Sequence, residues 1–74
     1  MTLDVELFGN LAPGAPRRQS IPLAAPAVAG EIARGLGVDP EAIGLVTLNG
    51  VLIDLEDEVA PGRRLCFFPP LSGG

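Results

Sequence analysis

The 74-residue sequence contains no histidine and has a single cysteine, Cys66. One cysteine cannot close a disulfide within the chain, and without histidine there is no Cys/His cluster of the kind that holds zinc. The sequence also offers no nucleophile–base pair and no glycine loop that could cradle a phosphate. These absences argue against a disulfide scaffold and a zinc module, and they predict a chain that is not catalytic by itself.

Lysine is absent as well, and the charge is one-sided. The five basic residues are all arginines, against nine acidic residues, which gives a formal net charge of −4. Nucleic-acid binding favours a basic patch, so this balance argues against a nucleic-acid partner and favours protein partners with basic surfaces. Because there is no lysine, no side-chain amine is present on which ubiquitin-type chains could be built.

Long apolar runs are also missing. Residues 2–6 alternate between apolar and polar types, unlike a secretory leader, and no run approaches the ~18 residues that a membrane helix needs. We therefore expect no membrane partner and a cytoplasmic location. A chain of this length allows one domain with a modest core, and it contains no repeat and no interdomain linker.

Short periodic segments account for most of the chain. Apolar–polar patterns predict strands at 2–8, 17–23, 45–48, 51–53 and 64–68 and a helix at 26–36, with a loop or short helical turn at 38–44 and a single turn over the core at 56–59. Asn49-Gly50 is the dipeptide most favoured in a type I′ hairpin turn, and Gly37 is expected to end the helix. Pro22 lacks a backbone donor, so its strand is predicted to lie at a sheet edge.

Alternation in the last strand separates two faces. It places Leu65 and Phe67 on one side and Cys66 and Phe68 on the other. We expect the first pair in the core with Leu3, Val5, Leu7, Val28, Ile32, Leu36, Val46 and Leu48. The open face would then be lined by Phe68, Cys66, Thr47, Leu45 and Phe8, and an exposed apolar group of this size is usually a binding surface. In a competing interpretation, Phe68 packs under the prolines that follow it. Cys66, solitary and between apolar residues, is expected to pack rather than react.

The last eight residues differ from everything before them. Pro69 and Pro70 cannot donate ladder hydrogen bonds, so the strand should stop at Phe68 and the chain should leave as a stiff, extended segment. After Leu71, the residues Ser72, Gly73 and Gly74 carry little bulk and could thread a narrow channel to present a terminal carboxylate. We therefore expect a folded domain at 1–68 and an extended tail at 69–74. The alternative is that the Gly-Gly end is only frayed chain.

The octet at 67–74, Phe-Phe-Pro-Pro-Leu-Ser-Gly-Gly, resembles the C-terminus of the MoaD/ThiS family of ubiquitin-like sulfur carriers. Its form is most similar to the small subunits of molybdopterin synthase within that family. The resemblance implies an α+β, β-grasp (ubiquitin-like) fold, in which one helix packs across one face of a small mixed sheet of four to five strands. It also implies that the first and last strands lie side by side and parallel.

The resemblance further implies a carrier function centred on Gly74. An ATP-dependent, E1-like enzyme would adenylate the terminal carboxylate, a sulfur donor system would convert it to a thiocarboxylate, and a molybdopterin synthase large subunit would hold the acceptor. Gly73 carries over as a threading residue, Phe68 as a partner-facing position, and Pro69 with Pro70 as the stiff root of the tail. The chain would bind no cofactor itself, because ATP is used by the activating partner.

Other functions remain open. The chain could serve thiamine synthesis, tRNA thiolation or cysteine synthesis as a sulfur carrier, it could be a protein modifier, or it could be a β-grasp binding module with an inert tail. It also departs from the family at 61–64, Pro-Gly-Arg-Arg, where relatives commonly carry Gly-Asp before the last strand. This departure concerns the partner surface and the subfamily rather than the tail.

Overall fold

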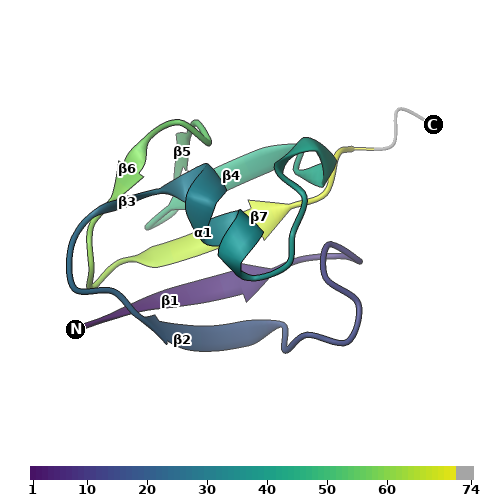
Figure 1. The fold of residues 1–74 in the computed structure, drawn as a ribbon. Helices are drawn as coiled ribbons and strands as arrows, with labels where there is room; N and C mark the ends of the chain where they lie inside the picture. The colour runs from purple at the N-terminus through teal and green to yellow at the C-terminus, as the bar shows by residue number, and fades with distance from the viewer. Residues whose placement is uncertain (72–74) are drawn as a thin grey trace.

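A five-stranded mixed sheet, with strand order β2-β1-β7-β4-β5, forms the body of the domain (Figure 1). The structure is a computed structural model, and it describes residues 1–71. The sheet consists of β1 (Thr2–Leu7), β2 (Arg18–Pro22), β4 (Leu45–Leu48), β5 (Val51–Ile53) and β7 (Arg64–Phe68), and the remaining elements are β3 (Ala27–Val28), α1 (Ala29–Gly35), the 3-10 turn η1 (Pro40–Ala42) and β6 (Glu58–Val59). The α1 helix lies across one face of the sheet (Figure 1). This arrangement confirms the α+β, β-grasp prediction.

Strands β1 and β7 form the parallel pair at the centre of the sheet. Their register runs from Asp4 opposite Arg64 to Leu7 opposite Phe67, whereas all other pairings in the sheet are antiparallel. The parallel pairing implied by the resemblance is therefore confirmed. Strand β2 lies at an edge, as the proline at its end predicted.

The type I′ turn predicted between β4 and β5 is also present. Asn49 and Gly50 both have positive φ angles, 51° and 83°, as this turn requires. Asn49 in addition ties the turn to β7, because its backbone N–H donates to the Arg64 carbonyl at 2.9 Å and its side-chain oxygen accepts from the Arg64 N–H at 2.9 Å. The hairpin is thereby joined to the neighbouring strand at its tip.

The core lies between the sheet and α1. Its buried residues are Leu3, Val5, Leu7, Leu11, Ala29, Ile32, Ala33, Val38, Val46, Val59, Leu65 and Phe67. Seven of these twelve were predicted, whereas the predicted core residues Val28, Leu36 and Leu48 are only half-buried. The difference at the helix has a simple cause: the small side chains of Ala29 and Ala33 face the sheet beside Ile32, so the buried stripe is shifted from the predicted one.

The helix begins three residues later than predicted. Residues 27–28 are extended and pair with 58–59 as a two-stranded sheet, so the prediction of a turn over the core at 56–59 is also wrong in its second half. Val28, the residue before the helix, has φ −74° and ψ 134° and makes no side-chain cap. Each of these two strands has only two residues, which is too short for a periodic pattern to reveal.

Backbone carbonyls of the 54–58 segment replace a side-chain cap at the start of α1. The N–H of Ala29 donates to Asp57 at 3.0 Å and the N–H of Gly30 donates to Leu55 at 2.8 Å, so two of the helix's otherwise unpaired donors are satisfied. A Cβ on Gly30 would lie 3.3 Å from the Leu55 carbonyl oxygen, a close contact that an alanine would make only if the 54–58 segment moved slightly.

The end of α1 follows the prediction. Gly37 has φ +83°, its N–H donates to the Arg34 carbonyl at 3.0 Å, and the N–H of Val38 donates to the Ala33 carbonyl at 2.9 Å. These two bonds make a Schellman motif, and Val38, which is 1% exposed, supplies its apolar contact. Within residues 1–71, no helix is both long enough and apolar enough to span a bilayer.

Candidate functional site: the tail root and the open face

The chain leaves the sheet at a fixed point. Strand β7 ends at Phe68, and backbone bonds hold its last two carbonyls from both sides: the Phe8 N–H donates to Phe67 at 3.0 Å, and the Gly44 N–H donates to Phe68 at 2.9 Å. We call residues 67–70 the tail root. Beyond it, Leu71 is 96% exposed. Ser72, Gly73 and Gly74, which carry the predicted chemistry, lie outside the described residues.

Two glycines flank the tail root closely. A Cβ on Gly44 would lie 2.4 Å from the Cα of Pro70, and a Cβ on Gly9 would lie 2.8 Å from the Cγ of Pro69. Neither distance is compatible with a side chain, and Gly9 also has φ +66°, a backbone conformation that favours glycine. Sequence reasoning placed these glycines only in connecting segments, because their role depends on a segment distant in the sequence.

An aromatic stack lies beside the tail root. The rings of Phe8 and Phe68 are nearly parallel, at 10°, with centroids 4.4 Å apart, and the guanidinium of Arg17 lies 4.7 Å from the centroid of the Phe8 ring. The ring of Phe68 thus stacks on the residue that follows β1, and it also lines a hollow with Pro69 and Pro70. Both rings are half-buried, so each keeps part of its surface available to a partner.

Strand register brings the predicted open-face residues together. Leu45 is opposite Phe68, and Thr47 is opposite Cys66, so these side chains share the face away from α1 with Phe8. Leu45 is 42% exposed, and the others are half-buried. Leu52, which pairs with Thr47 and is 64% exposed, extends this face and was not predicted. Its strand has three residues, too few for alternation alone to assign a face.

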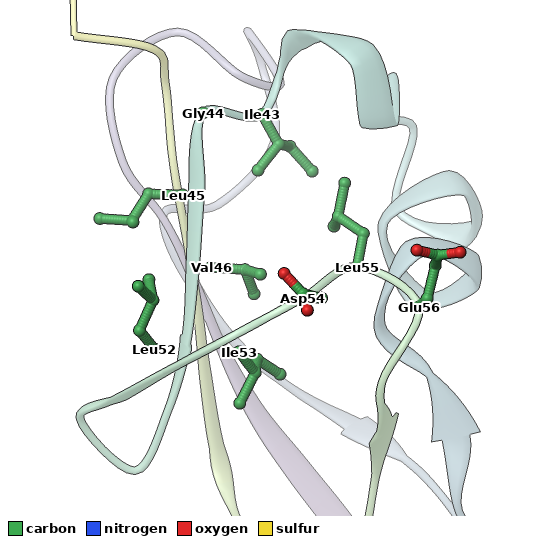
Figure 2. A pocket seen from close by; sticks show the side chains of 9 residues that line it. All are labelled: Ile43, Gly44, Leu45, Val46, Leu52, Ile53, Asp54, Leu55 and Glu56. Atoms are coloured by element: carbon green, nitrogen blue, oxygen red, sulfur yellow. The ribbon is translucent and has the colours of Figure 1, made fainter.

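Two hollows adjoin these residues. One, of about 600 Å³, is lined by Gly44, Leu45, Phe68, Pro69, Pro70 and Leu71. The other, of about 310 Å³, lies between the β4–β5 hairpin and residues 54–56; Figure 2 shows Val46, Ile43 and Leu55 turned toward one another, with Leu45 and Leu52 on the opposite side of the hairpin. Within residues 1–71, no three side chains of metal-ligating type gather into a cluster. The larger hollow has a mainly apolar lining and is suited to an apolar group, whereas the smaller one also carries Asp54 and Glu56.

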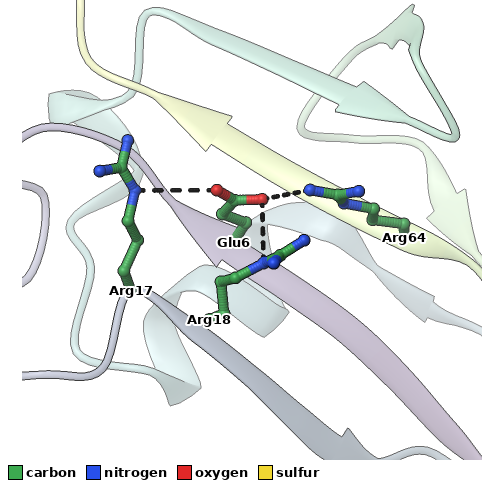
Figure 3. Close-up of polar contacts among 4 residues, drawn as sticks. All are labelled: Glu6, Arg17, Arg18 and Arg64. Carbon is green, nitrogen blue, oxygen red and sulfur yellow. Dashed lines mark hydrogen bonds and ion pairs between the residues drawn. The ribbon is translucent and has the colours of Figure 1, made fainter.

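A cluster of charges occupies the other half of the open face. The carboxylate of Glu6 in β1 lies 3.7 Å from Nε of Arg17 and 3.5 Å from Nε of Arg18, and it accepts a hydrogen bond from Arg64 in β7 (Figure 3). The side chain of Glu6 is 12% exposed, whereas those of the arginines are at least half exposed. Three positive charges around one negative charge leave a local positive excess, although the overall charge of the chain led us to expect partners with basic surfaces.

The arginines make Glu6 a pH-sensitive contributor to stability. The hydrogen bond from Arg64 lowers the pKa of Glu6 below its usual value of 4.5, and the charges of Arg18 and Arg17 act in the same direction. A carboxyl whose pKa is lower in the folded state stabilises the fold when ionised. Its contribution is therefore complete above pH 4.5 and is lost as the pH falls through the folded-state pKa.

We expect the Glu6→Gln variant to lose less stability on acidification than the wild type. Urea unfolding at a series of pH values between neutrality and acid would show a shallower fall in the free energy of unfolding below pH 4.5, because the amide cannot titrate. A Glu41→Gln variant is a suitable control, because it makes the same substitution at an exposed position in η1. Equal slopes for Glu6→Gln and the wild type would contradict the assignment.

A second prediction concerns the exposed ring. We expect Phe68→Ala to weaken binding of a partner to the open face by about 1–3 kcal/mol. The domain should stay folded. It should lose the stacking energy with Phe8, about 0.5–1.5 kcal/mol, and the free energy gained by burying part of the Phe68 ring. Isothermal titration against the partner, alongside thermal unfolding, separates the two quantities. A large loss of stability with unchanged binding would show that Phe68 acts in folding and not in docking.

Comparison with known proteins agrees with this geometry. No protein-family model matches the chain, and no curated protein matches it. Among solved structures, SAMP1 from Haloferax volcanii has a TM-score of 0.72 and 28% sequence identity, and the match covers 100% of both chains. The likeness supports the ubiquitin-like β-grasp fold of this chain over its whole length.

Proposed function

We propose that this chain is a ubiquitin-like sulfur carrier whose reactive group is the terminal carboxylate of Gly74. The observation that carries the proposal is the geometry of the tail root. The sheet ends at Phe68, and hydrogen bonds from the backbone N–H groups of Phe8 and Gly44 hold the point where the tail leaves the sheet, beside the open face. A partner that docks on this face would meet residues 69–71 at one edge of its footprint. The end-to-end likeness to a ubiquitin-like protein gives independent support.

The proposed chemistry requires a partner, because a carboxylate is anionic and a poor acyl electrophile. An E1-like enzyme would catalyse attack of a Gly74 carboxylate oxygen on the α-phosphorus of ATP; the new oxygen–phosphorus bond forms as the bond to pyrophosphate breaks. A hydrosulfide ion from the sulfur donor system would then attack the acyl carbon and release AMP, leaving a thiocarboxylate. In this scheme the residues of the chain bind the partner and orient the Gly74 carboxylate. The partner supplies ATP and the groups that act as acid and base.

For the sulfur acceptor, we propose the molybdopterin pathway. The chain would act as the small subunit of molybdopterin synthase and donate sulfur to a cyclic pyranopterin monophosphate held by the large subunit. The support is the resemblance of residues 67–74 to that group of carriers. The exposed side chains Leu45 and Leu52, together with Phe68, provide an apolar surface for a large subunit.

A role as a protein modifier is the second candidate, and the likeness to SAMP1 favours it. The same acyl-adenylate would then lead to a covalent bond between Gly74 and an amine on a target protein. Because the chain has no lysine, each target amine would receive a single copy rather than a polymer linked through lysine.

The mass of the intact protein from its native host distinguishes these functions. Replacement of one oxygen by sulfur at the C-terminus marks a carrier, and covalent adducts with other proteins mark a modifier. A Cys66→Ala variant is the control, since a persulfide on this half-buried free thiol would add a sulfur atom without removing oxygen. If neither form is found under any growth condition, the carrier and modifier proposals both fail. Co-purification of a pterin-binding large subunit would identify the acceptor pathway.

A further inference from the structure

We propose that Gly44 is a positioning residue that sets the direction in which the tail leaves the domain. By doing so it would control the delivery of the terminal carboxylate to the activating enzyme. This inference rests on the proposed function, but it concerns a residue outside the tail and outside the open face. It makes a separate claim that can fail while the carrier function stands.

The steric evidence is specific to the backbone of the tail. A Cβ on Gly44 would lie 2.4 Å from the Cα and 2.7 Å from the N of Pro70, and 3.0 Å from the carbonyl carbon of Pro69. These are backbone atoms, so the contact cannot be relieved by turning a flexible side chain aside. Because the proline rings fix φ at both positions, the segment has little freedom to bend locally. An added methyl group must therefore displace Pro69 and Pro70 together, while Phe67 and Phe68 stay paired in β7.

The backbone of Gly44 itself does not require glycine. Its φ angle lies outside the left-handed region, unlike that of Gly9. An alanine could therefore adopt the same conformation, and the close approach of the tail is what explains the glycine. The N–H of Gly44 also donates to the Phe68 carbonyl, so one residue both anchors the end of β7 and leaves room for the segment that follows.

A shift of Pro69 and Pro70 changes the point from which the rest of the tail must reach the activating enzyme. Gly74 lies four positions after Pro70, a reach of up to about 14 Å when extended. Misplacement of a reacting group by about 1 Å can cost about 10²-fold in rate. In contrast, the apolar surface at Phe68 and Leu52 would remain available for docking. The expected signature is a lower kcat for activation at an unchanged KM.

The test compares Gly44→Ala with wild type and with Gly35→Ala. Gly35 is a suitable control because its φ is not left-handed and a Cβ there meets nothing within 4 Å. With the adenylating enzyme purified from the native host, ATP–pyrophosphate exchange should show a tenfold to hundredfold lower kcat for Gly44→Ala, at about the wild-type KM. Gly35→Ala should match the wild type. In ¹⁵N-labelled protein, the amide signal of Leu71 should shift in Gly44→Ala but not in the control.

A second variant guards against failure of Gly44→Ala to fold. Replacing both Pro69 and Pro70 with alanine loosens the tail root without adding bulk, and it should likewise lower kcat at unchanged KM. Wild-type kcat in this variant, or in a folded Gly44→Ala, would overturn the proposal, as would an unchanged Leu71 signal. A rise in KM alone would also overturn it, since that would make Gly44 a docking position. If wild-type protein is not adenylated, the proposed function fails, and the Leu71 signal still decides whether Gly44 directs the tail.

Discussion

Deletion of Gly74 should abolish sulfur loading while leaving the domain folded. The deletion moves the terminal carboxylate back by one residue, about 3.3–3.6 Å in an extended chain, and a misplacement of even 1 Å can cost about 10²-fold in rate. The domain should be unaffected, because within residues 1–71 every buried core residue lies at or before Phe67. Pyrophosphate exchange would measure adenylation, intact mass would measure sulfur loading, and thermal unfolding would measure the stability of the domain.

A Gly74→Ala variant provides the matched control for length. It keeps the reach of the tail and adds one methyl group, so it separates the position of the carboxylate from the slimness of the tail tip. We expect it to retain more activity than the deletion. Loading of the deletion variant at the wild-type rate would contradict a role for the carboxylate of Gly74. Loss of its thermal transition would instead point to a structural effect.

Phe67→Ala should prevent the domain from folding stably. Phe67 is the largest of the fully buried side chains and is 0% exposed. Truncation of a buried phenylalanine to alanine typically costs 3–5 kcal/mol, roughly the ~3–5 kcal/mol of net stability that a core of this size supplies. Urea unfolding followed by circular dichroism should therefore show no cooperative transition, or one with a midpoint near zero denaturant.

The neighbouring Phe68→Ala variant is the matched control for this prediction. The same residue type is truncated one position along the chain, but on the other face of β7, where Phe68 is only half-buried. A cooperative transition in Phe68→Ala, with a midpoint lowered by loss of the stack with Phe8, and the absence of a transition in Phe67→Ala would assign the two faces. If Phe67→Ala instead unfolds cooperatively close to the wild-type midpoint, the core can repack around the cavity and the assignment of its centre is wrong.

Local signals in the sequence were sufficient for much of the fold. The bounds predicted for β4, β5 and β7 agree with the structure, since turn residues mark their ends: Asn49-Gly50 between the first two and Pro69 after the last. Gly37 ends the helix as predicted. In each case, the determining interaction lies within a few residues along the chain.

Contacts between distant segments account for what was missed. The pairing of β3 with β6 joins two-residue strands about thirty positions apart, and it converts the expected first turn of the helix into extended chain. Leu11 is buried although it belongs to no periodic pattern, whereas the burial of Val59 agrees with the prediction that 56–59 lies over the core. No rule based on neighbouring residues could identify the β3–β6 pairing or the burial of Leu11.

The candidate site likewise has features that the sequence predicted and features that depend on contacts between distant segments. Alternation placed Phe68 and Cys66 together on the open face, and the structure agrees. The convergence of three arginines on Glu6 depends on the relative register of β1, β2 and β7, which the sequence alone does not specify. The closeness of Gly44 to the tail root likewise depends on tertiary structure.

The central place of β7 ties the display of the tail to completion of the polypeptide. Until residues 64–68 have been synthesised, the hairpins β1–β2 and β4–β5 have no strand to join them, and the interior lacks Leu65 and Phe67. Pairing of Asp4 with Arg64 also spans most of the chain, a long-range contact of the kind that forms late in folding. A product truncated before residue 64 would thus have neither a stable sheet nor the point at which the tail leaves it.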